Sequence, residues 1–97
     1  MLTINDVIEF INKARDVWAF RVSYNAEEIA FTLDDKTYLN IGLNAKQDKC
    51  LIDSEISTVY IDVTPKEKLE LLKVILESKY IAEERLSAWI KNFNNEK

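Results

Sequence analysis

The chain has 97 residues, a formal net charge of −4, and a composition with no histidine, one cysteine, one glycine and one proline. The missing histidine excludes Ser-His-Asp and Cys-His catalytic pairs, imidazole acid–base chemistry and histidine-ligated metals. A single glycine excludes the glycine-rich loops that cradle phosphates. The composition therefore favours a protein that works by binding, is not an enzyme and needs no cofactor or metal.

Length and hydrophobic content predict one globular domain over residues 1–97. The hydrophobic fraction of 47% supports a packed core, and only the polar tail, residues 92–97, is expected to fray. One cysteine cannot form an internal disulfide, no basic and then apolar leader opens the chain, and no stretch approaches the roughly 18 apolar residues that span a bilayer. We therefore expect a cytoplasmic protein with no membrane contact.

The opening residues predict an amphipathic helix. Thr3 is a suitable N-cap, and Asp6 stands three residues later, where its carboxylate complements the first turn. Apolar residues then recur at helical spacing from Ile4 to Ile11. The helix is expected to end near Asp16.

From Trp18 the hydrophobic period changes to two, which is typical of half-buried strands. Three alternating runs, residues 18–24, 29–33 and 37–43, predict an antiparallel meander. Residues 50–63 add one further strand or two, and the pattern does not decide between them. Within this stretch Cys50 is expected to be a small buried apolar residue, because no histidine is present to activate its thiol.

The segment Thr64-Pro65-Lys66-Glu67 is the clearest local signal. Thr64 is an N-cap, Pro65 occupies the first helical position, and Glu67 completes a capping box. The predicted buried stripe of the helix that follows comprises Leu69, Leu72, Ile75 and Leu76.

A second apolar set lies closer to the C-terminus and comprises Ala82, Leu86, Trp89, Ile90 and Phe93. One continuous helix would place Lys79 and Glu83 in the middle of the apolar stripe. We therefore predict a break near residues 78–81 and two separate helices. The predicted fold class is α+β: an N-terminal helix, an antiparallel meander of three to five strands, and two C-terminal helices packed on one sheet face.

Charge is distributed unevenly along the chain. Residues 1–62 hold 11 acidic and 6 basic side chains, whereas residues 63–97 hold 6 acidic and 7 basic ones. An acidic sheet repels phosphate backbones, so nucleic acid is unlikely as a direct ligand. The same charge is also explained by solubility alone.

The solvent face of the predicted sheet supplies a candidate protein-binding patch. Tyr38 and Tyr60 fall opposite the core-facing positions of their strands, and tyrosine is favoured in protein interfaces. A cross-strand pair that only stabilises the sheet is the alternative for these two residues. The full candidate patch comprises Glu28, Asp34, Asp35, Tyr38, Tyr60 and Asp62.

The C-terminal residues Trp89, Ile90 and Phe93 are unusually apolar. A helix docked on the core explains them most simply, and a face for self-association into a homodimer or for binding a partner is the alternative.

The layout resembles that of small acidic α+β proteins from phages and prophages of low-GC Gram-positive bacteria. The resemblance rests on the opening helix at Leu2-Thr3-Ile4-Asn5-Asp6-Val7-Ile8, the short meander, and the capped helix that starts at Thr64-Pro65-Lys66-Glu67-Lys68-Leu69 and leads to Glu83-Glu84-Arg85-Leu86. Some proteins of that build are anti-CRISPR inhibitors. The resemblance implies an inhibitor that acts in the bacterial host cytoplasm.

Three functional hypotheses follow. The first is a small protein-binding modulator, such as a phage-encoded inhibitor of a host defence enzyme. The second is an assembly protein that self-associates through its C-terminal helices. The third is a nucleic-acid accessory factor that uses Arg21, Lys36 and Lys46 locally.

Overall fold

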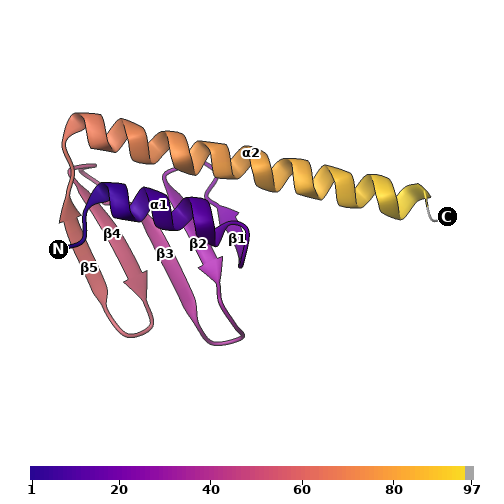
Figure 1. The fold of residues 1–97 in the computed structure, drawn as a ribbon, viewed down its shortest axis with the longest axis horizontal. Coiled ribbons are helices and arrows are strands. Elements are labelled where there is room, and N and C mark those ends of the chain that lie inside the picture. Colours follow the sequence, from indigo (N-terminus) through magenta and orange to yellow (C-terminus); the bar gives the residue numbers. More distant parts are fainter. Residues whose placement is uncertain (96–97) are drawn as a thin grey trace.

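The computed structural model describes residues 1–95 and shows two helices and five strands (Figure 1). In chain order the elements are α1 (Ile4–Ala14), β1 (Ala19–Val22), β2 (Glu28–Thr32), β3 (Tyr38–Leu43), β4 (Lys49–Ser54), β5 (Thr58–Asp62) and α2 (Pro65–Asn95).

The five strands form one antiparallel meander in the order β1-β2-β3-β4-β5. The predicted meander is therefore confirmed, and residues 50–63 contain parts of two strands rather than one. The turn between β4 and β5 is closed by Ser54, whose hydroxyl accepts hydrogen bonds from the backbone amides of Ile56 and Ser57.

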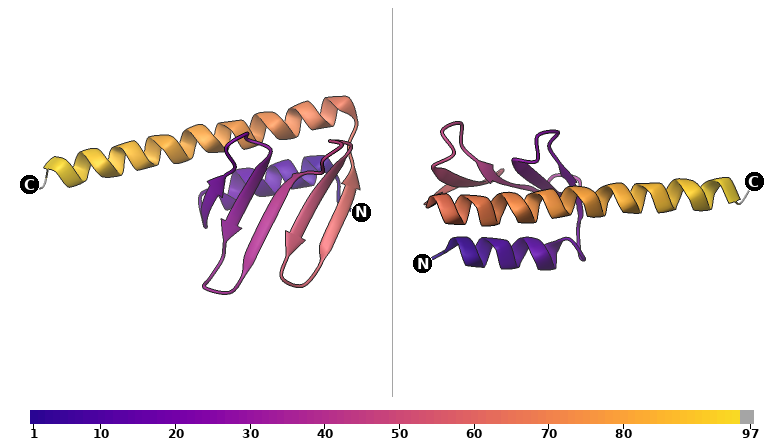
Figure 2. Two further views of the ribbon diagram at one scale, coloured as in Figure 1. Left: turned by 180° about the vertical axis from the view of Figure 1, so that it is seen from behind. Right: turned by 90° about the horizontal axis from the view of Figure 1, so that it is seen from above.

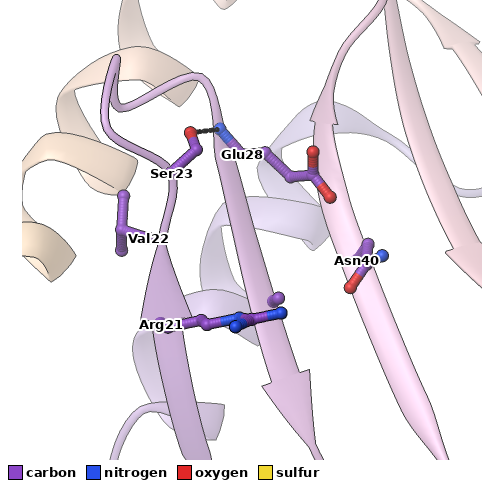
Figure 3. Close-up of a pocket in the computed structure, with 6 residues that line it drawn as sticks. Arg21, Val22, Ser23, Glu28 and Asn40 are labelled. Atoms are coloured by element: carbon purple, nitrogen blue, oxygen red, sulfur yellow. Dashed lines mark hydrogen bonds between the residues drawn. The ribbon is translucent and has the colours of Figure 1, made fainter.

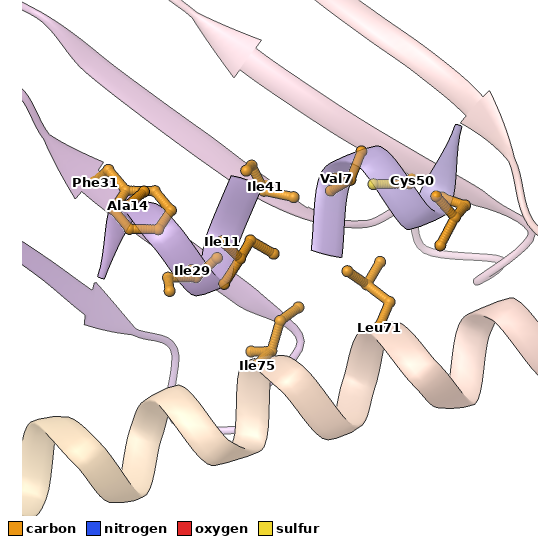
Figure 4. Packing of buried hydrophobic residues seen from close by; sticks show 10 residues of the cluster. Val7, Ile11, Ala14, Ile29, Phe31, Ile41, Cys50, Leu71 and Ile75 are labelled. Atoms are coloured by element: carbon orange, nitrogen blue, oxygen red, sulfur yellow. The ribbon is translucent and has the colours of Figure 1, made fainter. Parts of the chain in front are cut away.

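Both helices cover the same face of the sheet and run side by side (Figure 2). The core between the two helices and the sheet is built from buried side chains of α1, the sheet and α2 (Figure 4). α1 contributes Ile4, Val7, Ile11 and Ala14, the sheet contributes Ile29, Phe31, Ile41 and Cys50, and α2 contributes Leu71 and Ile75. The predicted α+β class is confirmed, and the opposite face of the sheet is left without a covering helix.

Both predicted helix starts are present as capping boxes. The Thr3 hydroxyl accepts from the Asp6 amide at 3.2 Å, and the Asp6 carboxylate accepts from the Thr3 amide at 2.9 Å. Thr64 and Glu67 repeat this exchange at 3.2 and 3.0 Å. Each box satisfies two amides that would otherwise lack a helical partner.

The prediction of two C-terminal helices is wrong, because α2 is one helix of 31 residues. The polar residues that suggested a break are accommodated without one. The Ser78 hydroxyl is buried, donates to the Val74 carbonyl at 2.8 Å and accepts from the Arg15 guanidinium at 3.1 Å. Lys79 lies at the edge of the packed face, where its ammonium donates to the backbone carbonyl of Tyr24 at 3.1 Å. The helix continues to Asn95, and of the tail predicted to fray only residues 96 and 97 lie outside the described residues.

The predicted buried stripe of α2 is also largely wrong. Ile75 is buried as expected, but the side chains of Leu69 and Leu76 are 59% and 40% exposed. The first three turns of α2 are apolar on two sides, so the sequence pattern allows either side to face the core. The structure buries Leu71, Ile75 and Ser78, the side on which α1 and the sheet pack.

Candidate functional site

The uncovered face of the sheet is one of two candidate surfaces. Its middle row crosses all five strands through Arg21, Ala30, Asn40, Asp53 and Thr58. The small side chain of Ala30 leaves a shallow hollow of about 380 Å³ beside this row, into which Arg21, Glu28 and Asn40 project (Figure 3). The side chains that line the hollow are mostly polar and include charges of both signs, so they offer hydrogen bonds to a ligand.

The predicted protein-binding patch is split between the two ends of this face. Tyr38 lies opposite Thr32, next to the β2–β3 turn that carries Asp34 and Asp35. Tyr60 lies in a different row, with Leu51, Gly42 and Glu28. Gly42 is four residues along β3 from Tyr38, a distance of roughly 14 Å at strand spacing.

Glu28, Tyr60 and Asp62 therefore gather at one end of the sheet, and Asp34, Asp35 and Tyr38 gather at the other. Both tyrosines are exposed, as the alternation predicts. A role of these six residues in binding a partner stays a prediction.

Two of the carboxylates in this patch already have structural partners. The Asp34 carboxylate accepts from the backbone amides of Lys36 at 2.8 Å and Thr37 at 2.7 Å, and these hydrogen bonds, led by that from Lys36, lower the pKa of Asp34. The Asp62 carboxylate accepts a hydrogen bond from the Lys49 ammonium, which raises the pKa of Lys49. The hydrogen bonds of Asp34 hold the β2–β3 turn in place, and the Lys49–Asp62 pair links β4 to β5.

The three cations considered for nucleic-acid binding do not share a surface. Lys36 lies in the β2–β3 turn and Lys46 in the β3–β4 turn, at opposite ends of β3. Arg21 lines the hollow between them, beside Glu28. Scattered cations of this kind do not form the basic stripe that tracks a phosphate backbone.

Groups that would support catalysis are scarce in the described part of the chain. Residues 1–95 contain no cluster of three or more histidine, cysteine, aspartate or glutamate side chains that could hold a metal ion. No described helix is long and apolar enough to cross a membrane. Cys50 is fully buried, as the sequence predicts, and desolvation raises the pKa of its thiol to about 11. A buried thiol with a raised pKa is a poor nucleophile.

The raised pKa of Cys50 predicts a loss of stability at alkaline pH. The folded protein disfavours the thiolate, so Cys50 contributes to the free energy of unfolding only while its thiol is protonated. This stabilisation is complete below about pH 9, the ordinary thiol pKa, and is lost as the pH rises toward 11. The difference between a thiol pKa of about 9 in the unfolded chain and about 11 in the folded protein corresponds to roughly 2–3 kcal/mol. Urea unfolding of wild type and Cys50→Ala at pH 8 and pH 11 checks this. The stability advantage of the wild type should shrink with pH, and a constant difference would contradict the prediction.

The second candidate surface is the exposed side of α2. In the C-terminal half of this helix Arg85 contacts the domain: its guanidinium donates to the Arg15 carbonyl at 3.1 Å and lies 5.6 Å from the centre of the Phe20 ring. Every residue from Glu83 to Asn95 is exposed, and Figure 1 shows this half of the helix extending beyond the sheet. The exposed large apolar side chains of α2 are Leu69, Leu76, Tyr80, Leu86, Trp89, Ile90 and Phe93.

The structure thus leaves Trp89, Ile90 and Phe93 exposed, so the docked arrangement that the sequence favoured is wrong. Trp89 is 64% exposed and stacks on Phe93 with ring centres 5.7 Å apart. Sequence reasoning missed Leu69, Leu76 and Tyr80 as surface residues. Their exposure follows from the side of α2 that packs on the sheet, which no local pattern specifies.

No family model matches the chain, and no curated protein or solved structure shows significant similarity to it. Functional assignment therefore rests on the chemistry of these two surfaces.

Proposed function

We propose that the protein is a non-enzymatic interaction protein, and that it binds a helical protein partner through the exposed apolar side of α2. The observation that carries the proposal is the run of seven large apolar side chains left exposed on one helix. Large exposed apolar patches commonly mark protein interaction sites, and Leu86, Ile90 and Phe93 lie together on adjacent turns of the projecting half.

The spacing of the exposed residues suits a helical partner. Leu86, Ile90 and Phe93 recur at intervals of four and three residues, the spacing by which amphipathic helices dock on one another. Trp89 adds a large aromatic side chain, one of the residue types that contribute most to binding energy in protein interfaces. The projecting half of α2 is accessible along its length, so a partner does not need to displace any element of the domain.

A modulator of another protein is the form of this function that the sequence resemblance implies. Inhibition of a host enzyme by a phage-encoded protein requires a binding surface and no chemistry of its own, which agrees with the unreactive Cys50. That role is part of the proposal. The hollow on the sheet is lined mostly by polar side chains, whereas α2 exposes seven large apolar ones, so we place the principal contact on the helix.

Photo-crosslinking in cells that express the protein tests the proposal. A photoreactive amino acid at Ile90 should yield discrete protein adducts, and the same group at Glu84, on another side of the helix, should yield few. Leu86→Ala combined with Trp89→Ala should remove the Ile90 adducts while circular dichroism shows an unchanged fold. Equal adducts from both positions, or none from Ile90, would contradict the proposal.

A further inference from the structure

Because α2 is a single helix, its exposed side carries a seven-residue repeat. Positions at alternating steps of three and four are Leu69, Leu72, Leu76, Lys79, Glu83, Leu86, Ile90 and Phe93. Six of the eight are apolar, and the two central positions carry opposite charges. A repeat of this kind over 25 residues, about three and a half heptads, is typical of a coiled-coil seam.

These eight positions, the seam, lie beside the packed face of α2; Leu72 and Lys79 are half-buried, and the other six are exposed. Leu71, Ile75 and Ser78 face the core, whereas the seam residues Leu76 and Leu86 are 40% and 58% exposed. Figure 1 shows α2 starting over the sheet and extending beyond it, and the seam positions from Leu69 to Phe93 cover most of the length of this helix. A partner helix can therefore contact the exposed seam residues on both sides of Lys79, whose ammonium lies 5.4 Å from the centre of the Tyr24 ring.

We propose that the partner is a second copy of this chain, paired with α2 in an antiparallel coiled coil centred on Ile81. This inference rests on the proposed function and names the partner of the same surface. In an antiparallel pair centred at that residue, Leu72 faces Ile90 of the second copy and Leu76 faces its Leu86. Leu69 faces Phe93 in the outermost layer. Every apolar residue of the seam meets an apolar residue.

The central charges complement each other in this register. Lys79 faces Glu83 of the second copy, and the two-fold axis repeats the pair in the opposite sense. The Lys79 ammonium has three donors, so it can keep its 3.1 Å hydrogen bond to the Tyr24 carbonyl while it contacts a carboxylate. Glu83 is exposed and makes no ion pair with any residue from 1 to 95.

Other arrangements place these charges badly. If the antiparallel register shifts by one heptad in one direction, Lys79 faces Ile90 and Glu83 faces Leu86. If it shifts by one heptad in the other direction, Lys79 faces Leu76 and Glu83 faces Leu72. A parallel pair sets lysine against lysine and glutamate against glutamate. Buried polar or charged seam residues are known to select one register and orientation at the expense of others. Lys79 and Glu83 therefore specify the antiparallel pair.

The half of α2 that packs on the sheet in one copy lies along the projecting half of the other. The two sheets consequently lie near opposite ends of the helix pair, and the projecting half of each helix is covered by the other copy.

Sedimentation equilibrium of the full chain over a range of concentrations tests the proposal. The wild type should form a dimer. Glu83→Lys or Lys79→Glu should raise the dissociation constant of this dimer at least about tenfold, because each change places like charges opposite one another twice at the centre of the seam. The double exchange Lys79→Glu with Glu83→Lys should restore the dimer, since it exchanges the two charges without changing their pairing. Glu84→Lys makes the same charge change outside the seam and should leave the dimer intact. Circular dichroism establishes that each variant is folded.

Three results would overturn the second-copy proposal. These are a wild-type protein that stays monomeric at several hundred micromolar, a double exchange that does not restore a dimer lost in the single variants, and an equal effect of Glu84→Lys. None of them removes Ile90 adducts to other proteins in the crosslinking experiment, so the proposed function can survive the loss of this inference. A monomeric wild type without any Ile90 adduct would overturn both.

Discussion

Replacing Ile75 with alanine is expected to lower the free energy of unfolding by about 2–5 kcal/mol, whereas Leu76→Ala should cost about 1 kcal/mol or less. The two residues are neighbours on α2 but face different surroundings. Ile75 is fully buried in the core against α1 and the sheet (Figure 4), so its truncation leaves a cavity. Leu76 is partly solvent-exposed, so its truncation leaves no enclosed space.

Urea unfolding followed by circular dichroism measures both changes. The protein concentration should be low enough to keep the chain monomeric, so that loss of self-association at Leu76 does not enter the result. An unchanged slope of free energy against urea would show that the variants unfold from the same compact state. Equal losses at the two positions would instead place both residues on the buried side, as the sequence pattern predicts.

The elements with purely local determinants were predictable from the sequence. Thr3 and Thr64 define helix starts because each capping box lies within four consecutive residues. The strands from Ala19 to Leu43 alternate with period two because one sheet face is covered and the other is not. Short turns then require consecutive strands to pair as a meander.

The C-terminal half was not predictable in the same way, because its pattern depends on tertiary contacts. α2 has apolar residues on the core-facing side and along the seam, and local periodicity does not distinguish the two. Lys79 and Glu83 suggested a break only if one buried stripe was assumed to run through them. In the structure the buried side passes through Ser78 instead, where Arg15 supplies a partner that the sequence does not reveal.

The candidate surfaces show the same division. Alternation placed Tyr38 and Tyr60 on the open sheet face, but their separation depends on the register of three strands. The apolar character of Trp89 and Ile90 is evident from the sequence. Their exposure is not, because it depends on the point along α2 at which the sheet ends.

The continuity of α2 predicts that a proline in its middle is severely disruptive. Tyr80 lies within the segment where the sequence predicts a break, and its side chain is exposed, so little packing is lost when it is replaced. Tyr80→Pro removes one helical hydrogen bond and sets the proline ring against the carbonyl of Leu76. We expect a loss of about 3 kcal/mol or more in the free energy of unfolding.

Tyr80→Ala is the matched control, because it removes the same side chain and keeps the helical backbone; it should be close to wild type in stability. Urea unfolding and the helical circular dichroism signal measure the difference between the two variants. If two helices met near residue 80, proline would be tolerated there and both variants would behave alike.

In a continuous helix, Tyr80→Pro also bends the seam between Leu76 and Leu86, so the two halves no longer align with a straight partner. Self-association should then be lost in Tyr80→Pro and retained in Tyr80→Ala, because the antiparallel pair depends on one unbroken axis from Leu69 to Phe93.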